Sequence, residues 1–325
     1  MRVLVTGGTG FIGRHVIRAL EARGHALTIA VRTPESAETG WQGRHRVVPV
    51  GDICGTTDWR SALQDVDAVV HLAAQAHIAD PSDDALEEFQ RTNVLGTDRL
   101  AEQAAASGVR HFVLMSSIGA VTNSSEERVT LDTPCHPSTP YGRSKLASER
   151  ALTKRASGTP MAWTILRPTL VYGRDNPGNM RRLIALVRLG LPLPIGAIQN
   201  RRSFTYVENL ADLVAHTLEH PAAENQVFLV ADGDDLSTPE LVRKIATLSG
   251  SRVRILDFPV PLLSGIARSL DAASGALSIR LPTARVAIER LAASLYVDCD
   301  DVRNRLDWCP PFGVDEGLRC MLDAP

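Results

Sequence analysis

The stretch TGGTGFIG at residues 6–13 decides the fold class of this chain. It follows a short β-branched run and opens a stretch of helical periodicity, which is the context that a phosphate-binding turn requires. Glycine in such a turn lets backbone N–H groups approach a pyrophosphate, and the N-terminus of the following helix adds partial positive charge. The stretch therefore predicts a dinucleotide-binding turn built on Gly7, Gly8, Gly10 and Gly13.

Further along the chain, short β-branched runs alternate with helical stretches, which is typical of βαβ units. The predicted strands are the runs at 2–7, 26–32, 45–50, 67–74, 111–117, 162–168 and 226–231. Two helices are predicted from their apolar spacing and glycine stops, at 13–24 and 89–108. The pattern predicts an α/β fold with a Rossmann-type, doubly wound parallel sheet.

After about residue 175 the pattern changes to helical stretches punctuated by proline, interrupted by one predicted strand, RVRILDF at 252–258. We expect a dinucleotide-binding Rossmann domain over residues 1–175, with further sheet and helix segments around 203–235. We expect a smaller, mostly helical substrate-binding lobe over residues 176–202 and 236–325.

The bulk composition excludes several classes of protein. The formal net charge is −2 over 325 residues, so nucleic acid or an anionic membrane is not expected as the principal partner, although a local basic pocket is compatible with it. The N-terminus has no secretory signal and the chain has no uncharged apolar window of about 18 residues, so a cytoplasmic protein without a membrane span is expected. The five cysteines never form a CxxC pair, which favours reduced thiols and no metal site.

The ends of the second, third and fourth predicted strands bear on the cofactor. An acid at the end of the second strand would accept the ribose 2′-hydroxyl of NAD, but Arg32 stands there and could hold a 2′-phosphate. NADP(H) is therefore favoured over NAD, with a solvated Arg32 as the alternative. Asp52 with Ile53 is placed to meet the adenine, and the stretch HLAAQA at 71–76 puts Leu72, Ala73 and Ala74 where the carboxyl end of the fourth strand would skirt the cofactor.

The stretch TPYGRSKLASER at 139–150 places Tyr141 and Lys145 four positions apart at the start of a predicted helix, hence on one face. An adjacent ammonium favours phenolate, so we expect Lys145 to lower the pKa of Tyr141 from its usual value near 10. Ser117 ends the fifth strand and could hydrogen-bond the same substrate oxygen. The alternative is an amphipathic helix that happens to begin with an aromatic ring, but the serine-tipped strand and the glycine turn favour catalysis.

With these residues the chain resembles the extended short-chain dehydrogenase/reductases, the group that includes nucleotide-sugar epimerases, dehydratases and reductases. The resemblance covers nearly the whole length. It rests on TGGTGFIG (6–13), Asp52 with Ile53, HLAA (71–74), RTNVLGT (91–97), Ser117, YGRSK (141–145), LRPTLVYG (166–173), RRSFTYVENLAD (201–212) and DWCPPFGVDEGL (307–318).

The resemblance implies roles for particular residues. Tyr141 would be the acid and base, Lys145 would bind the nicotinamide ribose, and Ser117 would orient the reacting oxygen. It also implies cofactor contacts at Phe11, Ile12, Asn93 and Pro168, with Asn93 in the supporting polar shell. Arg202 matches the position that contacts the nucleotide diphosphate, and Asn179 and Arg290 are weaker candidates for the same cleft. The alternative for Arg201, Arg202 and Arg290 is solvated surface charge.

Departures from the family pattern narrow the reaction. Dehydratases of this group place an Asp-Glu pair after the serine, but Ile118 and Gly119 stand there and cannot move a proton. Two reactions at C4 of a UDP-linked sugar remain: reduction of a 4-keto-6-deoxy-hexosamine by NADPH, which Arg32 favours, or 4-epimerisation of a UDP-hexose with tightly bound NAD. A regulator that binds a dinucleotide without turnover is a minor alternative, and a steroid-type dehydrogenase is disfavoured by the late arginines. The resemblance also allows a homodimer paired through the helices near 95–106 and 143–155.

Overall fold

A computed structural model describes residues 1–76, 83–176, 178–259, 261–262, 265, 288–289 and 291–322. One parallel sheet of seven strands has the order β3-β2-β1-β4-β5-β6-β9. The strands are β1 (Arg2–Thr6), β2 (Ala26–Val31), β3 (Arg46–Pro49), β4 (Ala68–His71), β5 (His111–Met115), β6 (Ala162–Pro168) and β9 (Gln226–Val230). All seven predicted strands lie in this sheet, so the doubly wound α/β fold is confirmed. The strand order reverses between β1 and β4, where ligands bind in such sheets.

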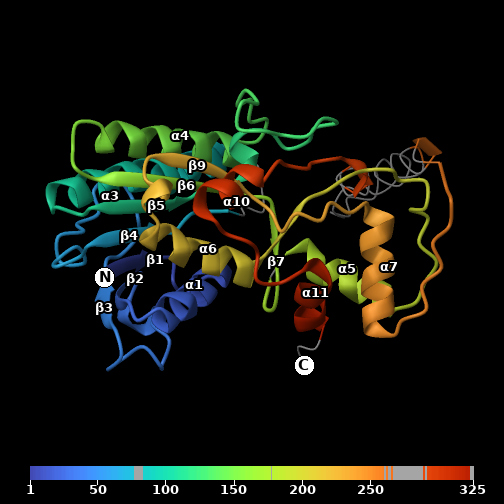
Figure 1. Ribbon diagram of the computed structural model, residues 1–325, viewed down its shortest axis with the longest axis horizontal. Helices are drawn as coiled ribbons and strands as arrows, with labels where there is room; N and C mark the ends of the chain where they lie inside the picture. The colour runs from blue at the N-terminus through green and yellow to red at the C-terminus, as the bar shows by residue number, and fades with distance from the viewer. Residues whose placement is uncertain are drawn as a thin grey trace.

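Helices cover both faces of the sheet (Figure 1). On one face lie α1 (Phe11–Ala22) and α6 (Val207–Glu219), and on the other lie α3 (Gly96–Ala106) and α4 (Pro140–Ala156). Alternate residues of β1 serve the two faces: Val3 and Val5 belong to the core under α1 and α6, whereas Leu4 belongs to the opposite core. Burial on both faces is why these strands read as continuous apolar runs.

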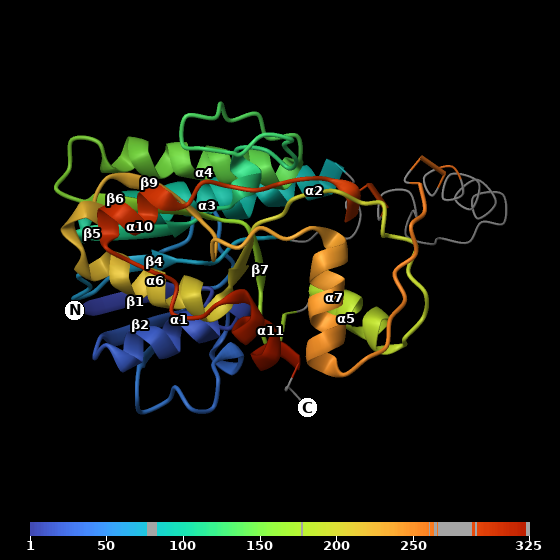
Figure 2. The same cartoon turned by 45° about the vertical axis from the view of Figure 1, so that its right-hand side comes forward.

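A third hydrophobic core lies beside the sheet, and we call the region around it the α5–α7 lobe. It contains α5 (Asn179–Arg188), α7 (Thr238–Ser249) and α11 (Val314–Leu322), which lie next to one another in Figure 2. Strands β7 (Leu170–Tyr172) and β8 (Phe204–Tyr206) pair as a separate parallel ribbon at its border. Sequence patterns did not predict these two strands, because three residues show no periodicity.

The remaining elements of the described residues are short. They are α2 (Asp83–Glu88), a π-helix η2 (Phe89–Leu95), α10 (Asp300–Leu306) and the 3₁₀ turns η1 (Pro34–Ser36), η3 (Ile118–Ala120) and η4 (Pro221–Ala223). The helix predicted over 89–108 is therefore present, but its first two turns are π-helical.

The predicted strand at 252–258 is wrong. Only Ile255 forms a bridge there, with Leu193, through hydrogen bonds on either side of that residue. The partner segment has Pro192 and Pro194 beside Leu193, and proline has no N–H to extend a ladder. The alternating pattern of the segment is real, but its neighbour forms one bridge, at Leu193, and one further hydrogen bond, from the Gly196 amide to the Leu256 carbonyl at 2.9 Å.

Candidate active site

The glycine turn between β1 and α1 is packed so closely that side chains would not fit. Gly7 has φ 72°, and a Cβ on it would lie 2.6 Å from the amide nitrogen of Ala73. A Cβ on Gly13 would lie 2.1 Å from the carbonyl oxygen of Gly7. Gly10 is the N-cap of α1 and offers no side-chain acceptor to the first-turn amides. The turn therefore has the open backbone and the close approach to β4 that a bound pyrophosphate needs.

Further predicted cofactor residues lie at the start of α1 and at or after the carboxyl ends of β3, β4 and β6. Phe11 and Ile12 begin α1 and are partly buried. Leu72, Ala73 and Ala74 follow β4, and Pro168 is the buried last residue of β6. Ile53 packs against the backbone of Gly96 in α3, where an added Cβ would lie 2.5 Å from its side chain.

Arg32 and Asp52, predicted to contact different parts of the cofactor, form an ion pair with each other. The Nε of Arg32 lies 3.0 Å from the Oδ1 of Asp52, and their side chains are 74% and 61% exposed. An exposed pair of this kind is weak and can open to admit a ligand. The positive charge of Arg32 is therefore partly offset within the chain itself.

Ser117, Tyr141 and Lys145 come together at the carboxyl edge of the sheet. Helix α4 begins at Pro140, and the N-cap Thr139 accepts a hydrogen bond from the Gly142 amide at 3.1 Å. This cap fixes the first turn, which carries Tyr141, and Lys145 follows one turn later with only 4% exposure. The side chain of Ser117 lies close enough to the Tyr141 hydroxyl to favour its phenolate form.

The electrostatics of this pair differ from the sequence-based expectation. Burial raises the pKa of Tyr141 to about 12, although the side chain of Ser117 acts in the opposite direction. Burial also lowers the pKa of Lys145 to about 8, and Glu149 works against this shift. The prediction that Lys145 lowers the tyrosine's pKa is wrong for the chain alone, because loss of water around the phenolate dominates and Ser117 is the group that acts against it. Both groups are pushed toward their neutral forms.

Asn93 connects the segment after β4 to the first turn of α4. Its Oδ1 accepts from the Gln75 amide at 2.8 Å, and its Nδ2 donates to the Gln75 carbonyl at 3.0 Å and to Ser144 Oγ at 2.9 Å. Ser144 Oγ in turn donates to the carbonyl of Tyr141 at 2.8 Å. Asn93 lies in the π-helix. Its side-chain amide therefore links the segment after β4 to the first turn of α4, which carries Tyr141.

Sequence reasoning missed a buried ion pair directly behind Lys145. Arg167 of β6 donates through Nε and Nη2 to the two carboxylate oxygens of Glu149, at 3.0 and 2.7 Å. Ser116, next to Ser117, also donates to Glu149. Glu149 lies four residues after Lys145, so the spacing Tyr-x-x-x-Lys-x-x-x-Glu is a signal that could have found it. The network fastens α4 to the ends of β5 and β6.

His71 at the end of β4 was also missed. Its Nδ1 lies 2.7 Å from Thr6 Oγ1 and its Nε2 lies 3.0 Å from Thr97 Oγ1. Burial lowers the pKa of His71 to about 3, and the charge of Lys145 adds to the shift. The ring is therefore neutral at physiological pH. Near Lys145, it joins β1 to α3 through its hydrogen bonds with Thr6 and Thr97.

The predicted substrate residues have different outcomes. Arg202 is partly buried, which lowers the pKa of its guanidinium, and its backbone pairs with Leu236. Arg201 is 56% exposed and stacks on Tyr296, with 4.7 Å from its guanidinium carbon to the ring centre. The surface-charge alternative therefore fits Arg201 but not Arg202. The side chain of Asn179 and all of Arg290 lie outside the described residues. In the part of the chain that is described, no three acidic, His or Cys side chains gather as metal ligands.

Comparisons with known proteins agree with this geometry. The model of the NAD dependent epimerase/dehydratase family matches residues 3–231. The UDP-glucose 4-epimerase of Vibrio cholerae is 34% identical over 327 residues, which cover 99% of this chain and 94% of that protein. The solved complex of MoeE5 with UDP-glucuronic acid and NAD is 26% identical, has a TM-score of 0.77, and is matched over 99% of this chain and 98% of that one. The solved complex of the Thermus thermophilus UDP-glucose 4-epimerase with NAD is 25% identical, with a TM-score of 0.73 and coverage of 99% and 98%.

Proposed function

Because the chain belongs to the NAD dependent epimerase/dehydratase family of extended short-chain dehydrogenase/reductases, we propose that it moves a hydride between a nicotinamide dinucleotide and C4 of a UDP-linked sugar. The observation that carries the proposal is the pairing of Tyr141, which lies beside Ser117, with the buried amine of Lys145 one helical turn away. A phenol in that setting can pass a proton to or from a sugar oxygen.

The residues present fit a dinucleotide. The amides of the turn at residues 7–13 would hold its pyrophosphate, and the amine of Lys145 would hydrogen-bond its ribose hydroxyls. When bound, the nicotinamide supplies or accepts the hydride. The related solved complexes that contain NAD support NAD as the cofactor.

The proton belongs to Tyr141. With a pKa of about 12, its hydroxyl is protonated at neutral pH and can donate to a C4 carbonyl oxygen as that oxygen gains negative charge. In the reverse direction the phenolate must form, which requires a positive charge nearby, and Lys145 is the chain's own source of it. Ser117 would orient the sugar oxygen, and Arg202 would bind the diphosphate through its forked donors.

Between the two reactions at C4, we propose 4-epimerisation first. The relative that is 34% identical over nearly the whole chain is a UDP-glucose 4-epimerase, and Asp52 offsets the charge of Arg32 on which an NADP preference depends. The second candidate is the NADPH-dependent reduction of a UDP-4-keto-6-deoxy-hexosamine. It is favoured by the exposed Arg32 at the end of β2, since a 2′-phosphate could displace Asp52.

One set of assays separates these functions. The nucleotide released from denatured protein is identified by mass spectrometry, and UDP-hexose and UDP-N-acetylhexosamine are followed for change at C4 without added cofactor. In parallel, the absorbance of NADPH is followed with a UDP-4-keto-6-deoxy sugar. Released NAD with interconversion of C4 epimers supports epimerisation, and substrate-dependent NADPH oxidation supports reduction. Activity in neither assay, with a dinucleotide bound, would leave only a binding protein and defeat the proposal.

A further inference from the structure

The α5–α7 lobe presents a surface on which arginines and leucines are both exposed. Helix α5 and the turn after it contribute Leu186, Leu189 and Leu191, which are 40%, 67% and 54% exposed. The extended segment at 252–256 contributes Leu256, which is 48% exposed. Exposed arginines stand among them, namely Arg181, Arg182, Arg188, Arg252 and Arg254. We call these nine residues the arginine–leucine face.

The two segments form one continuous surface. The amide of Leu193 donates to the carbonyl of Arg254 at 2.8 Å, and the amide of Leu256 donates to the carbonyl of Leu193 at 2.9 Å. Val253 and Ile255 pack against the third hydrophobic core, so the alternate residues Arg252, Arg254 and Leu256 point outward. Figures 1 and 2 both show the chain after α5 and the chain after α7 running together along the outer margin of the lobe.

Helix α5 contributes its whole outer side to this face. Ile184 and Val187 face the core, whereas Arg182, Leu186 and Leu189 recur at helical spacing on the opposite side. A helix that carries leucine where its outer surface should be polar marks an interaction site rather than an ordinary solvated face.

The charge on this face is one-sided. The segments 179–196 and 251–257 contain five arginines and a single acid, Asp257. Among the residues that the structure describes, Arg181, Arg182, Arg252 and Arg254 form no ion pair, and Arg188 donates to the carbonyl of Leu322. The whole chain has a net charge of −2, so overall composition conceals this local excess of positive charge.

We propose that the arginine–leucine face docks the protein on the surface of a bilayer that contains anionic phospholipid. The leucines would enter the boundary between headgroups and acyl chains, and the arginines would lie at the lipid phosphates. A second copy of the chain fits less well, because a two-fold contact through this face would set arginines against arginines. Nucleic acid would leave the leucines without a partner. No helix in the described part of the chain could cross a bilayer, so the contact lies at the surface.

The test is cosedimentation of the full chain with vesicles. Phosphatidylcholine vesicles are compared with vesicles of equal parts phosphatidylcholine and phosphatidylglycerol, at low and high salt. We expect binding to the anionic vesicles only, weakened by salt. Each arginine near an anionic surface is expected to contribute about fivefold, so a variant with Arg181, Arg182, Arg252 and Arg254 all changed to Gln should bind about 600-fold more weakly.

Matched variants identify the face. Leu189→Ser with Leu191→Ser should weaken binding while keeping its salt dependence. A control removes the same charge elsewhere, with exposed Arg60, Arg110, Arg150 and Lys154 changed to Gln, and should bind vesicles as the unaltered chain does. Urea unfolding curves of the four-arginine and the two-leucine variants should match that of the unaltered chain, which shows that they fold, and turnover of a soluble UDP-sugar should be unchanged.

Three results would overturn the proposal: equal binding to neutral and anionic vesicles, equal loss of binding in the control, or no vesicle binding at all. A change in sedimentation of the four-arginine variant without lipid would assign the face to a second copy instead. None of these readouts depends on which sugar reaction the enzyme catalyses.

Discussion

The two ends of helix α4 carry ionisable side chains in opposite electrostatic settings. At the first turns, burial pushes Tyr141 and Lys145 toward their neutral forms. At the last turn, Arg155 donates to both carboxylate oxygens of Asp98, at 2.8 and 2.7 Å, and to Glu102 at 3.0 Å, and these acids raise its pKa. The surroundings of the first turns therefore disfavour the charged forms of Tyr141 and Lys145, whereas the acids at the last turn stabilise the charged form of Arg155. Burial brings the pKa of Lys145 toward neutral pH and moves that of Tyr141 away from it, so both shifted pKa values lie at the first turns of the helix.

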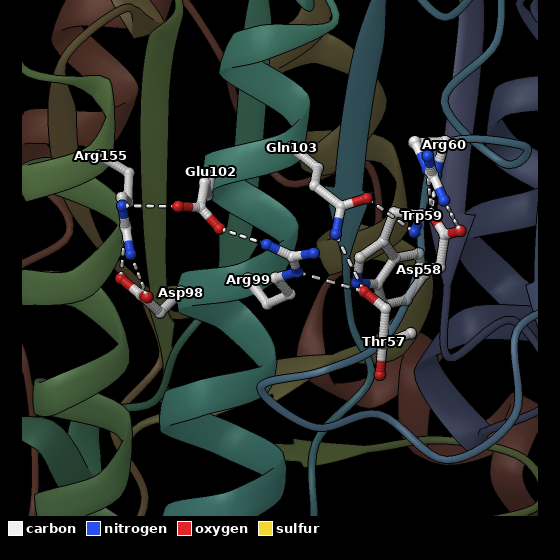
Figure 3. Close-up of polar contacts among 9 residues, drawn as sticks. All are labelled: Thr57, Asp58, Trp59, Arg60, Asp98, Arg99, Glu102, Gln103 and Arg155. Atoms are coloured by element: carbon white, nitrogen blue, oxygen red, sulfur yellow. Dashed lines mark hydrogen bonds and ion pairs between the residues drawn. The ribbon is translucent and has the colours of Figure 1, made fainter.

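We call the N-terminal turns of α4 its inner end and the C-terminal turn its outer end. The outer end belongs to a chain of polar contacts that Figure 3 shows across two helices and a loop. Glu102 of α3 pairs with Arg99 at 2.7 Å, and the side chain of Gln103 joins the Thr57 carbonyl and the Trp59 amide at 2.9 and 2.8 Å. These contacts fasten α4 to α3 and α3 to the loop at residues 57–60. The outer end therefore serves as an anchor, which lets the inner end hold groups whose charged forms are costly.

The largest effect is expected at the inner end, from Tyr141→Phe. Removing one oxygen takes away the proposed proton donor, so turnover should fall by about 100-fold or more. Stability and dinucleotide binding should change little, because the ring still packs beside Phe89. Steady-state rates and cofactor titration measure the two quantities. Tyr296→Phe, a tyrosine outside the site, is the control, and an equal loss of turnover there would remove the special status of Tyr141.

Glu149→Gln breaks the contact that opposes the neutralisation of Lys145. It leaves Arg167 buried without its counterion, which should destabilise the fold by about 3–5 kcal/mol. Because Glu149 raises the pKa of Lys145 against burial, its loss should lower that pKa below about 8. Activity that needs the ammonium should then disappear at lower pH than before.

The double variant Glu149→Gln with Arg167→Met separates the two consequences. It removes the orphaned charge, so much of the stability should return, while the alkaline limit of activity stays shifted because the carboxylate is still missing. Unfolding curves and a pH–rate profile report them independently. An unshifted profile in both variants would mean that Glu149 only braces the helix.

Much of the fold and part of the site could be predicted from sequence. Parallel strands buried on both faces give apolar runs, and Tyr141 and Lys145 are neighbours by helical spacing alone. Arg167 and Ser116 could not be assigned to Glu149, since they come from strands whose adjacency is fixed only by the sheet order. The direction of the tyrosine's pKa shift was wrong because spacing reveals a neighbouring amine but not the loss of water around the phenol.

The two edges of the sheet each carry a buried histidine. His71 lies at the carboxyl edge of the sheet, where it ends β4, and His111 lies at the opposite edge, where its Nε2 is 2.8 Å from Thr164 Oγ1. Burial lowers the pKa of His111 to about 4 and that of His71 to about 3. A lowered pKa means that the unfolded chain binds more protons in acid, so stability is present above about pH 6.5 and is lost as pH falls toward these values.

His111→Gln should remove one of these acid-sensitive contributions without touching the active site. At pH 4 the penalty carried by His111 is on the order of 3 kcal/mol, by the linkage between pKa and stability. The urea midpoint of the variant should therefore fall less between pH 7 and pH 4 than that of the unaltered chain, and turnover at pH 7 should be retained. Parallel pH curves for the two proteins would show that His111 is already protonated in the fold.

The smallest effect is expected at the outer end, from Arg155→Ala. Its side chain is 36% exposed and that of Asp98 is 30% exposed, so water and salt screen their interaction. The loss of stability should be about 1 kcal/mol or less, and turnover should be unchanged. A double-mutant cycle with Asp98→Ala, at low and high salt, measures the coupling directly.

A coupling of that size, beside a loss of about 100-fold in rate from one oxygen at Tyr141, would show that the helix concentrates its function where its charges are least stabilised. If Arg155→Ala instead reduced turnover strongly at full stability, the outer contacts would position the inner pair, and the two ends of α4 would have to be treated as one unit.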